Sequence, residues 1–192
     1  MGGLVRGELL ALLLLAACGS PPLHPVSTDR LTNGGFEDGT AGWGTGYIED
    51  SIRKYHGENE SLLPLVKMPK VDAVGGLTMD AHSGKAAYWI TNYTRVGPNL
   101  FATLSQVVAV EPGAVYGVRL WTKALKTEPG LWYITTEREW EPHTMLPSDP
   151  TWTLAEHRFT TQNTTKSVEV RIVVQGPGSF GIDDVSLVRY TR

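Results

Sequence analysis

The sequence predicts an all-β domain, a β-sandwich of the jelly-roll type. Charged residues make up only 19% of the 192-residue chain, while glycine, threonine, valine, tryptophan and tyrosine are plentiful, a balance typical of sheet proteins. Several short apolar or alternating segments are separated by turns that contain glycine and proline. Helical patterns, with apolar residues three and four positions apart, are hard to find. These observations favour a single sandwich domain over residues 27–192.

Six segments have the length and composition of β-strands: residues 86–91, 107–110, 115–123, 131–136, 166–174 and 179–189. Turns rich in glycine and proline separate some of them, such as residues 111–113 (EPG) and 176–178 (GPG). No internal repeat is visible. The order of strands and turns is that expected of a sandwich or jelly roll.

Strand alternation predicts which side chains point to the core, because successive residues of a strand face opposite sides of the sheet. We expect these residues to point inward: Tyr88, Ile90, Tyr116, Val118, Leu120, Val168, Val170, Ile172 and Val174. Their neighbours then point outward: Trp89, Arg119, Trp121, Lys123, Glu169, Arg171, Val173 and Gln175. For residues 131–136 the pattern leaves open which of Trp132 and Tyr133 points inward.

Residues 1–17 have the pattern of a bacterial lipoprotein signal peptide. The apolar run from Leu9 to Ala17 has the length of a signal h-region and is too short to span a hydrocarbon core of ~30 Å. It ends in Leu15-Ala16-Ala17-Cys18, which resembles the bacterial lipobox, where the cysteine after the cleavage point is linked to diacylglycerol. We therefore expect a lipid on Cys18, the only cysteine of the chain. The alternative is an ordinary secretory signal in which Cys18 is incidental.

Residues 18–26, with the lipidated cysteine at their start, are rich in proline, glycine and serine and predict a short semi-rigid tether. Gly19 rather than aspartate follows the cysteine, which favours the outer membrane. We expect a lipid-anchored protein of the cell envelope. The net charge is −3 and no basic run is visible, so no nucleic acid is expected as a partner.

Three motifs stand in order along the domain: residues 31–37 (LTNGGFE) followed by Gly42 and Trp43, residues 82–87 (HSGKAA), and residues 180–187 (FGIDDVSL). Together they resemble the carbohydrate-binding modules of families four, nine and twenty-two, which accompany bacterial cellulases and xylanases. The resemblance covers essentially all of residues 27–192. It implies a galactose-binding-like jelly roll, non-catalytic binding of a polysaccharide or oligosaccharide, and a separate glycoside hydrolase as a partner.

The resemblance also implies a structural calcium ion (Ca²⁺), held by the residues that match Glu37 and Asp183 and by backbone oxygens that include one near Lys85. The residues themselves agree, because the first and last strands of a jelly roll can lie side by side. Two carboxylates held close repel unless a cation or proton intervenes, and oxygen ligands suit calcium. Alternation points Asp184 away from Asp183. The alternative is that Glu37 and Asp183 are surface carboxylates.

The first motif contains a turn at residues 33–35 (NGG), whose glycines tolerate positive φ angles. Phe36, directly after the turn, is expected to anchor the core.

Sugar recognition uses flat aromatic rings against the apolar face of the sugar, with arginine and amide groups bonding its hydroxyls. The outward-facing residues that suit this chemistry are Trp89, Arg119, Trp121, Arg171 and Gln175. The alternative is that the tryptophans pack in the core or beneath loops. Trp140 and Trp152 flank a polar, proline-rich loop and either rim the site or pin that loop.

No motif of a serine hydrolase, zinc protease or phosphate-binding loop is present. Glu137, Glu139 and Glu141 form an acidic run that is more typical of a solvated strand edge than of paired catalytic carboxylates. His143 and His157 lie in polar surroundings and are expected to be solvated. We therefore expect no catalytic activity. The alternatives are an envelope sandwich used for structure or protein contacts, and a small glycan-cleaving hydrolase or lyase.

Overall fold

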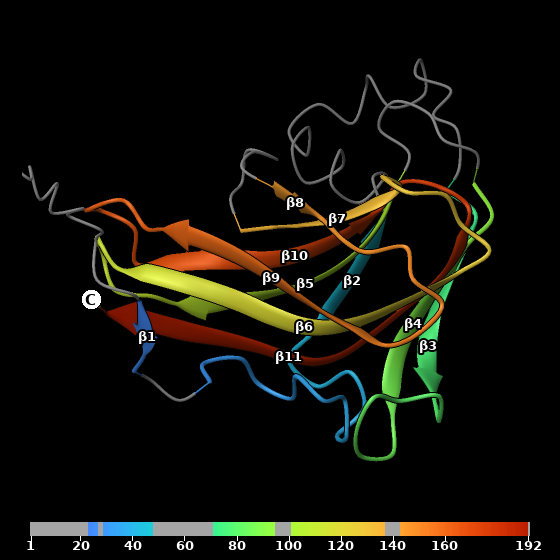
Figure 1. The fold of residues 1–192 in the computed structure, drawn as a ribbon, viewed down its shortest axis with the longest axis horizontal. Coiled ribbons are helices and arrows are strands. Elements are labelled where there is room, and N and C mark those ends of the chain that lie inside the picture. The colour runs from blue at the N-terminus through green and yellow to red at the C-terminus, as the bar shows by residue number, and fades with distance from the viewer. Residues whose placement is uncertain (1–22, 27–28, 48–70, 95–100, 137–142, 192) are drawn as a thin grey trace, which may run out of the picture.

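The computed structural model describes residues 23–26, 29–47, 71–94, 101–136 and 143–191. This part of the chain forms eleven β-strands and no α-helix (Figure 1). Accordingly, the described residues include no helix long and apolar enough to cross a membrane. The predicted signal peptide and lipidation site, residues 1–17 and Cys18, lie outside these residues, as do Trp140 and the acidic run of Glu137, Glu139 and Glu141.

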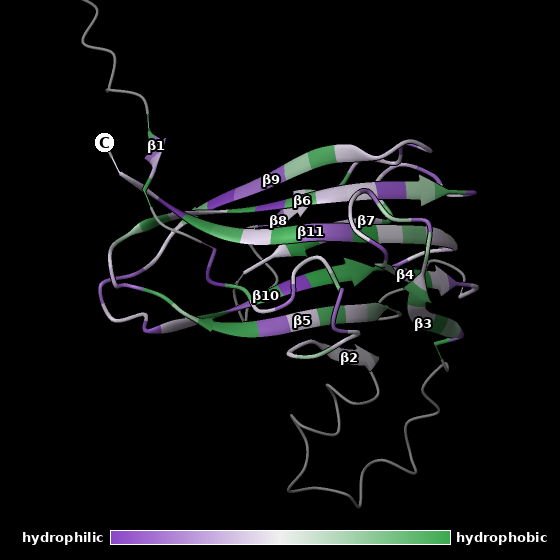
Figure 2. Cartoon of the chain, turned by 90° about the horizontal axis from the view of Figure 1, so that it is seen from below, coloured by the Kyte–Doolittle hydropathy of each residue, from purple (hydrophilic) through white to green (hydrophobic). Residues whose placement is uncertain are grey.

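The strands form two antiparallel sheets, which confirms the predicted sandwich. Sheet A has the order β3 (Ala73–Thr78), β4 (Ala87–Asn92), β11 (Gly178–Thr191), β6 (Val115–Leu125) and β9 (Thr153–Thr160), with β1 (His24–Pro25) beside the end of β11. Sheet B has the order β2 (Gly44–Tyr47), β5 (Ala102–Ala109), β10 (Ser167–Val174), β7 (Trp132–Thr135) and β8 (His143–Met145). Figure 2 shows β6, β9 and β11 in one layer and β5 and β10 in the other.

The inward-facing residues predicted by alternation are confirmed. The residues of β10, β6 and β4 that were predicted to point inward are all buried in one core cluster. Trp132 also points into this core, which resolves the ambiguity on β7. The expectation for Val173 is wrong in one respect. It has the outward parity of Arg171, yet it is fully buried, so this part of the outer face is covered.

The strand β9 is the main element that the sequence interpretation missed. Its inward-facing residues are Ala155, His157 and Phe159, and a histidine in the middle of the row disguises the alternation. The expectation that His157 is solvated is wrong, since only 2% of its surface is exposed. Its ring nitrogens contact the hydroxyls of Thr136 and Thr144, and these contacts satisfy both nitrogens inside the core.

The chain joins the domain slightly earlier than residue 27. His24 and Pro25 pair with Thr191 and Tyr190 at the end of β11, and the Val26 N–H donates to the Arg189 carbonyl oxygen. The last part of the predicted tether is therefore tied into sheet A (Figure 1).

Candidate functional site

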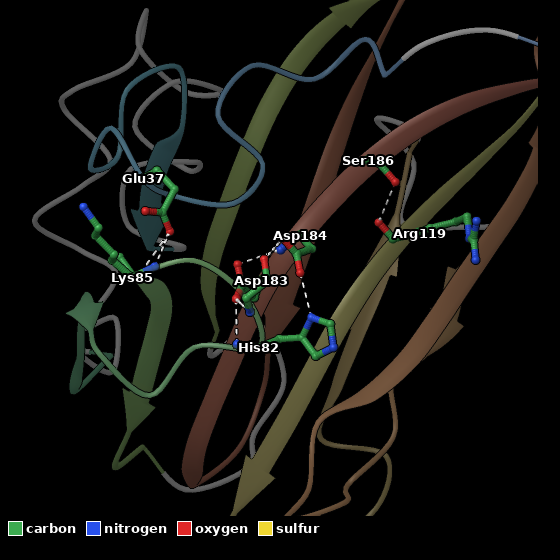
Figure 3. Close-up of polar contacts among 9 residues, drawn as sticks. Glu37, His82, Lys85, Arg119, Asp183, Asp184 and Ser186 are labelled. Carbon is green, nitrogen blue, oxygen red and sulfur yellow. Dashed lines mark hydrogen bonds and ion pairs between the residues drawn. The ribbon is translucent and has the colours of Figure 1, made fainter.

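The loop of residues 82–86 connects the two ends of the domain through hydrogen bonds from its backbone. The Glu37 carboxylate accepts bonds from the N–H groups of Lys85 and Ala86, at 2.7 and 3.2 Å. The Asp183 carboxylate accepts bonds from the N–H groups of His82 and Ser83, at 2.7 and 3.1 Å. Two carboxylates from distant parts of the sequence therefore meet one loop, and this loop offers them backbone N–H groups (Figure 3).

Gly84 is required in this loop for two reasons. Its φ of +64° lies in the left-handed region, and a Cβ there would lie 2.1 Å from Glu37 Oε1. A side chain at this position would therefore push Glu37 away from the loop.

Asp184 faces the same loop as Asp183, contrary to the expectation from alternation. Its carboxylate contacts His82 Nδ1 at 2.7 Å and accepts a bond from the Ser83 hydroxyl at 2.8 Å (Figure 3). The pairing of β11 with β6 shifts register between Asp183 and Ser186, and Asp184 has a φ of 47°. Because this bulge adds one residue to β11, the side chains beside it no longer alternate between the two faces of the sheet, and Asp183 and Asp184 both face the loop.

The Glu37 and Asp183 carboxylates offer oxygen atoms, the ligand type that calcium takes. Asp183 is fully buried, and burial raises the pKa of its carboxyl, while the backbone N–H groups of Ser83, Asp184 and His82 oppose the rise. A cation would stabilise a carboxylate that is otherwise met only by backbone dipoles. Among the described residues no three acidic, histidine or cysteine side chains converge as a metal site. The other ligands of a calcium ion would therefore be backbone oxygens.

The outer face of sheet A carries an aromatic cluster formed by His82, Trp89, Trp121 and Trp152. The rings of His82 and Trp121 are stacked, with centroids 3.7 Å apart and planes at 11°. Trp89 and Trp152 meet edge to face at 6.1 Å. Only 8% of Trp89 is exposed, and its indole N–H donates to the Asp80 carbonyl oxygen. These contacts occupy one face of Trp121 and nearly all of Trp89.

Lys123 extends this cluster towards the solvent. Its ammonium group lies 5.9 Å from the ring centroids of both Trp89 and Trp152 and forms an ion pair of 2.8 Å with Asp80. Such cation–π contacts add to the packing of the rings. The predicted tryptophans thus lie on the expected side of their strands, and they pack against the loop that precedes β4.

The outer face of sheet B carries a polar strip, formed by Ser105, Thr135, His143, Glu169 and Arg171. The register of four strands aligns Ser105, Arg171, Thr135 and His143 in one row across the sheet. Glu169 forms an ion pair with Arg171, whose side chain is 17% exposed. Ser105 and His143 are half-buried and Thr135 is buried. The strip is most open near Val107. This residue is paired with Glu169, and 69% of its surface is exposed.

The structure does not bring the five predicted ligand-binding residues together. Trp89, Trp121 and Arg119 lie on sheet A, where Arg119 is exposed, whereas Arg171 and Gln175 belong to β10 and its end in sheet B. A single groove therefore cannot contain all five, since the outer faces of a two-layer sandwich point in opposite directions. The sequence interpretation missed the ring contact of His82, whose only signal was its place in the HSGKAA motif.

Comparisons with known proteins identify the fold. No family model and no curated protein match the sequence. A solved family 4 carbohydrate-binding module aligns with 83% of this chain and 99% of its own, at 14% identity and a TM-score of 0.57. A family 61 carbohydrate-binding module in complex with β-1,4-galactotriose aligns with 85% of this chain and 99% of its own, at 21% identity and a TM-score of 0.53.

The enzymatically active domain of tailspike protein 4 from bacteriophage CBA120 is also similar. It matches 84% of this chain at 13% identity and a TM-score of 0.54, but this chain spans only 21% of its length. The two modules, in contrast, are matched over nearly their whole length. The architecture and these similarities show that this chain has the jelly-roll β-sandwich fold of carbohydrate-binding modules.

Proposed function

We propose that this protein binds polysaccharide without cleaving it, through the outer face of sheet B. The observation that carries the proposal is the row that the strand register aligns across the sheet, in which Ser105, Arg171 and His143 are partly exposed and Thr135 is buried between Arg171 and His143. A row of hydrogen-bonding side chains along one direction suits a ligand that repeats along its length. The modules of the same fold support this function, since one of them was solved with a bound galactotriose.

Arg171 is the residue of this row best suited to sugar hydroxyls. Its guanidinium group offers several donors in a fixed plane, and Glu169 holds that plane in place. The hydroxyl of Ser105 lies beside Arg171 in the row and can donate or accept. The Arg171 guanidinium and the Ser105 hydroxyl can therefore form hydrogen bonds with the hydroxyl groups of an uncharged sugar.

The aromatic cluster on sheet A is less suited to be the main sugar platform. A tryptophan binds a sugar through a free ring face, and His82 covers one face of Trp121 at a centroid distance of 3.7 Å. Trp89 is almost entirely enclosed. We assign these rings to the packing of the loop before β4.

We further propose a lipid on Cys18 that anchors the protein in the cell envelope, at the outer membrane, and a structural calcium ion at Glu37 and Asp183. The lipobox pattern of residues 15–18 supports the first, and the buried Asp183 carboxylate supports the second. A separate glycoside hydrolase acting on the captured polysaccharide would be the partner of such a protein.

Binding of the full chain to a panel of plant, algal and bacterial polysaccharides, measured by affinity electrophoresis, tests the proposal. Arg171→Ala should weaken binding to the recognised polysaccharide about tenfold, because hydrogen bonds from a charged group are lost. Arg119→Ala, on the opposite sheet, is the matched control and should bind as the wild type does. If folded protein binds no polysaccharide, the envelope structural or protein-contact function replaces this proposal.

A further inference from the structure

A hollow of about 510 Å³ opens at one end of the polar strip. Its position follows from the lengths of the strands in sheet B. β10 pairs with β5 over its whole length, from Ser167 to Val174, but pairs with β7 only from Arg171 onward. β7 ends at Thr135, so within the part of the chain that the structure describes no strand pairs with residues 167–170 on that side. The hollow lies in the notch that this short strand leaves.

The lining of the hollow is dominated by uncharged hydrogen-bonding side chains. The described lining residues are Val107, Thr136, Phe159, Thr160, Thr161, Gln162, Thr164, Thr165, Ser167, Val168 and Glu169. Two of the hydroxyls are already engaged: Thr136 contacts His157, and Thr161 donates to the Glu111 carbonyl oxygen. The side chains of Thr160, Gln162, Thr164, Thr165 and Ser167 have no hydrogen-bond partner among the described residues.

The charges around the hollow limit what it can hold. Its described lining contains no lysine, arginine or histidine, and its one carboxylate, on Glu169, is paired with Arg171. Among the described lining residues, a phosphate, sulfate or uronic acid group would find no cation and would meet the Glu169 carboxylate. Phe159, Val107 and Val168 add apolar surface beside the hydroxyls. A neutral sugar ring has both matching parts, hydroxyl groups at its edge and C–H groups on its faces.

The size and place of the hollow also fit a sugar. Its volume lies within the range of ~300–1,000 Å³ that is usual for small-molecule sites. Val107 and Glu169 belong both to the hollow and to the outer face of sheet B, where they are directly paired. The hollow therefore lies beside the row of Ser105 and Arg171, two residues further along β5 and β10, within reach of a sugar unit of a chain bound on that row.

We propose that the hollow is a subsite for one neutral, uncharged sugar unit of the polysaccharide bound on the polar strip, held by Thr164, Thr165, Ser167 and Gln162. This rests on the proposed function, since it assigns part of the ligand to a defined place. It adds a selectivity that the fold does not specify: neutral chains bind, and chains with an acidic unit at this position are excluded.

The test uses the full chain and three neutral oligosaccharides, built of glucose, xylose or galactose, with a galacturonic acid oligosaccharide as the acidic counterpart. Affinity is measured by titration calorimetry for the wild type and for the double variant Thr164→Val/Thr165→Val, which removes two hydroxyls and keeps the side-chain shape. Thr40→Val is the matched control, because Thr40 is exposed in the turn before β2 and is not among the residues that line the hollow. NMR of threonine methyl groups reports contact in the hollow.

The proposal expects at least a fivefold loss of affinity for a neutral oligosaccharide in the double variant, no loss in Thr40→Val, and methyl shifts at Thr160, Thr164 and Thr165. If the double variant binds with wild-type affinity and the methyl signals do not shift, the hollow is not a sugar subsite, and the polar strip alone is the binding site. Tighter binding of the galacturonic acid oligosaccharide also overturns it. If no polysaccharide or oligosaccharide binds at all, the proposed function itself fails.

Discussion

The backbone of Gly34 lies directly against that of Val185, whose N–H donates a hydrogen bond of 2.9 Å to the Gly34 carbonyl oxygen. A Cβ on Gly34 would lie 1.8 Å from the Val185 carbonyl oxygen. This contact holds the turn before Phe36 against the bulge of β11, and so it places Glu37 and Asp183 around the same loop. Gly34 and Gly35 tolerate positive φ but do not adopt it here; Asn33 and Phe36 have the positive φ angles, at 53° and 56°.

Gly34→Ala should lower the free energy of unfolding by about 2–4 kcal/mol, because the new methyl group collides with backbone atoms that cannot rotate away. Denaturant unfolding measures the change. Gly35→Ala is the matched control, since the nearest atom to its Cβ would lie 3.5 Å away. Equal stability of the two variants would contradict the close approach of the two segments.

Acidification should destabilise the protein through His157. Burial and then the nearby His143 lower the pKa of His157 from its ordinary value of 6.5. As the pH falls below about 6.5, the unfolded chain takes up a proton here that the folded chain does not, so the free energy of unfolding falls until the folded pKa is passed. Above pH 6.5 both states are neutral at this position and the effect vanishes.

His157→Gln should flatten this pH dependence between about pH 6.5 and 5, above the range where most carboxylates titrate. The measurement is denaturant unfolding at a series of pH values. His24→Gln, on the exposed strand β1, serves as the control and should keep the wild-type slope. An unchanged slope in His157→Gln would show that another group is responsible.

Calcium should raise the thermal unfolding midpoint of metal-free protein, and a chelator should lower it again. A ligand present at 100 times its Kd stabilises the folded state by about 2.7 kcal/mol. Glu37→Gln and Asp183→Asn should abolish the response, while Asp38→Asn, at an exposed position next to Glu37, should retain it. A wild-type midpoint that is the same with calcium and with chelator would leave Asp183 stabilised by backbone N–H groups alone.

Trp121→Ala should cost about 2–4 kcal/mol of stability, since it removes the ring stacked on His82. Polysaccharide affinity should stay at the wild-type level if the polar strip of sheet B is the site. The stability losses of Trp121→Ala and His82→Ala should not add up in the double variant that carries both changes, because the two rings contact each other. Lost affinity with unchanged stability would instead locate the sugar on sheet A.

Cys18→Ser should release the full chain from the membrane, because the proposed lipid has no other attachment point in a chain with one cysteine. Fractionation of cells into membrane and soluble parts, with labelled fatty acid as a second readout, measures this. Ser20→Ala, two positions further on, should stay in the membrane fraction. Recovery of the wild type in the soluble fraction, without label, would favour an ordinary secretory signal.

The strands that the sequence predicted are those with strong alternation or long apolar runs. Residues 115–123 and 166–174 correspond closely to β6 and β10, because a buried face imposes a period of two on the residue types. β2, β3 and β9 were missed, as were the short strands β1 and β8. β2 and β3 contain glycine pairs or alternate glycines, and β9 has His157 at a core position. None of these three strands has a clear alternation of apolar and polar residues. They form because neighbouring strands supply their hydrogen-bond partners.

For the candidate site, too, some features follow from the sequence and others only from the tertiary structure. By itself the sequence determined the fold class, the three ordered motifs and which side of a strand each of Trp89, Trp121 and Arg171 occupies, since these depend on local order and a period of two. Only the tertiary structure decided that Asp184 turns with Asp183 and that Trp121 is covered by His82. It also decided that Arg119 and Arg171 lie on opposite faces. A bulge, a loop crossing and the assignment of strands to two sheets join residues far apart in the chain, and such contacts leave no periodic trace in the sequence.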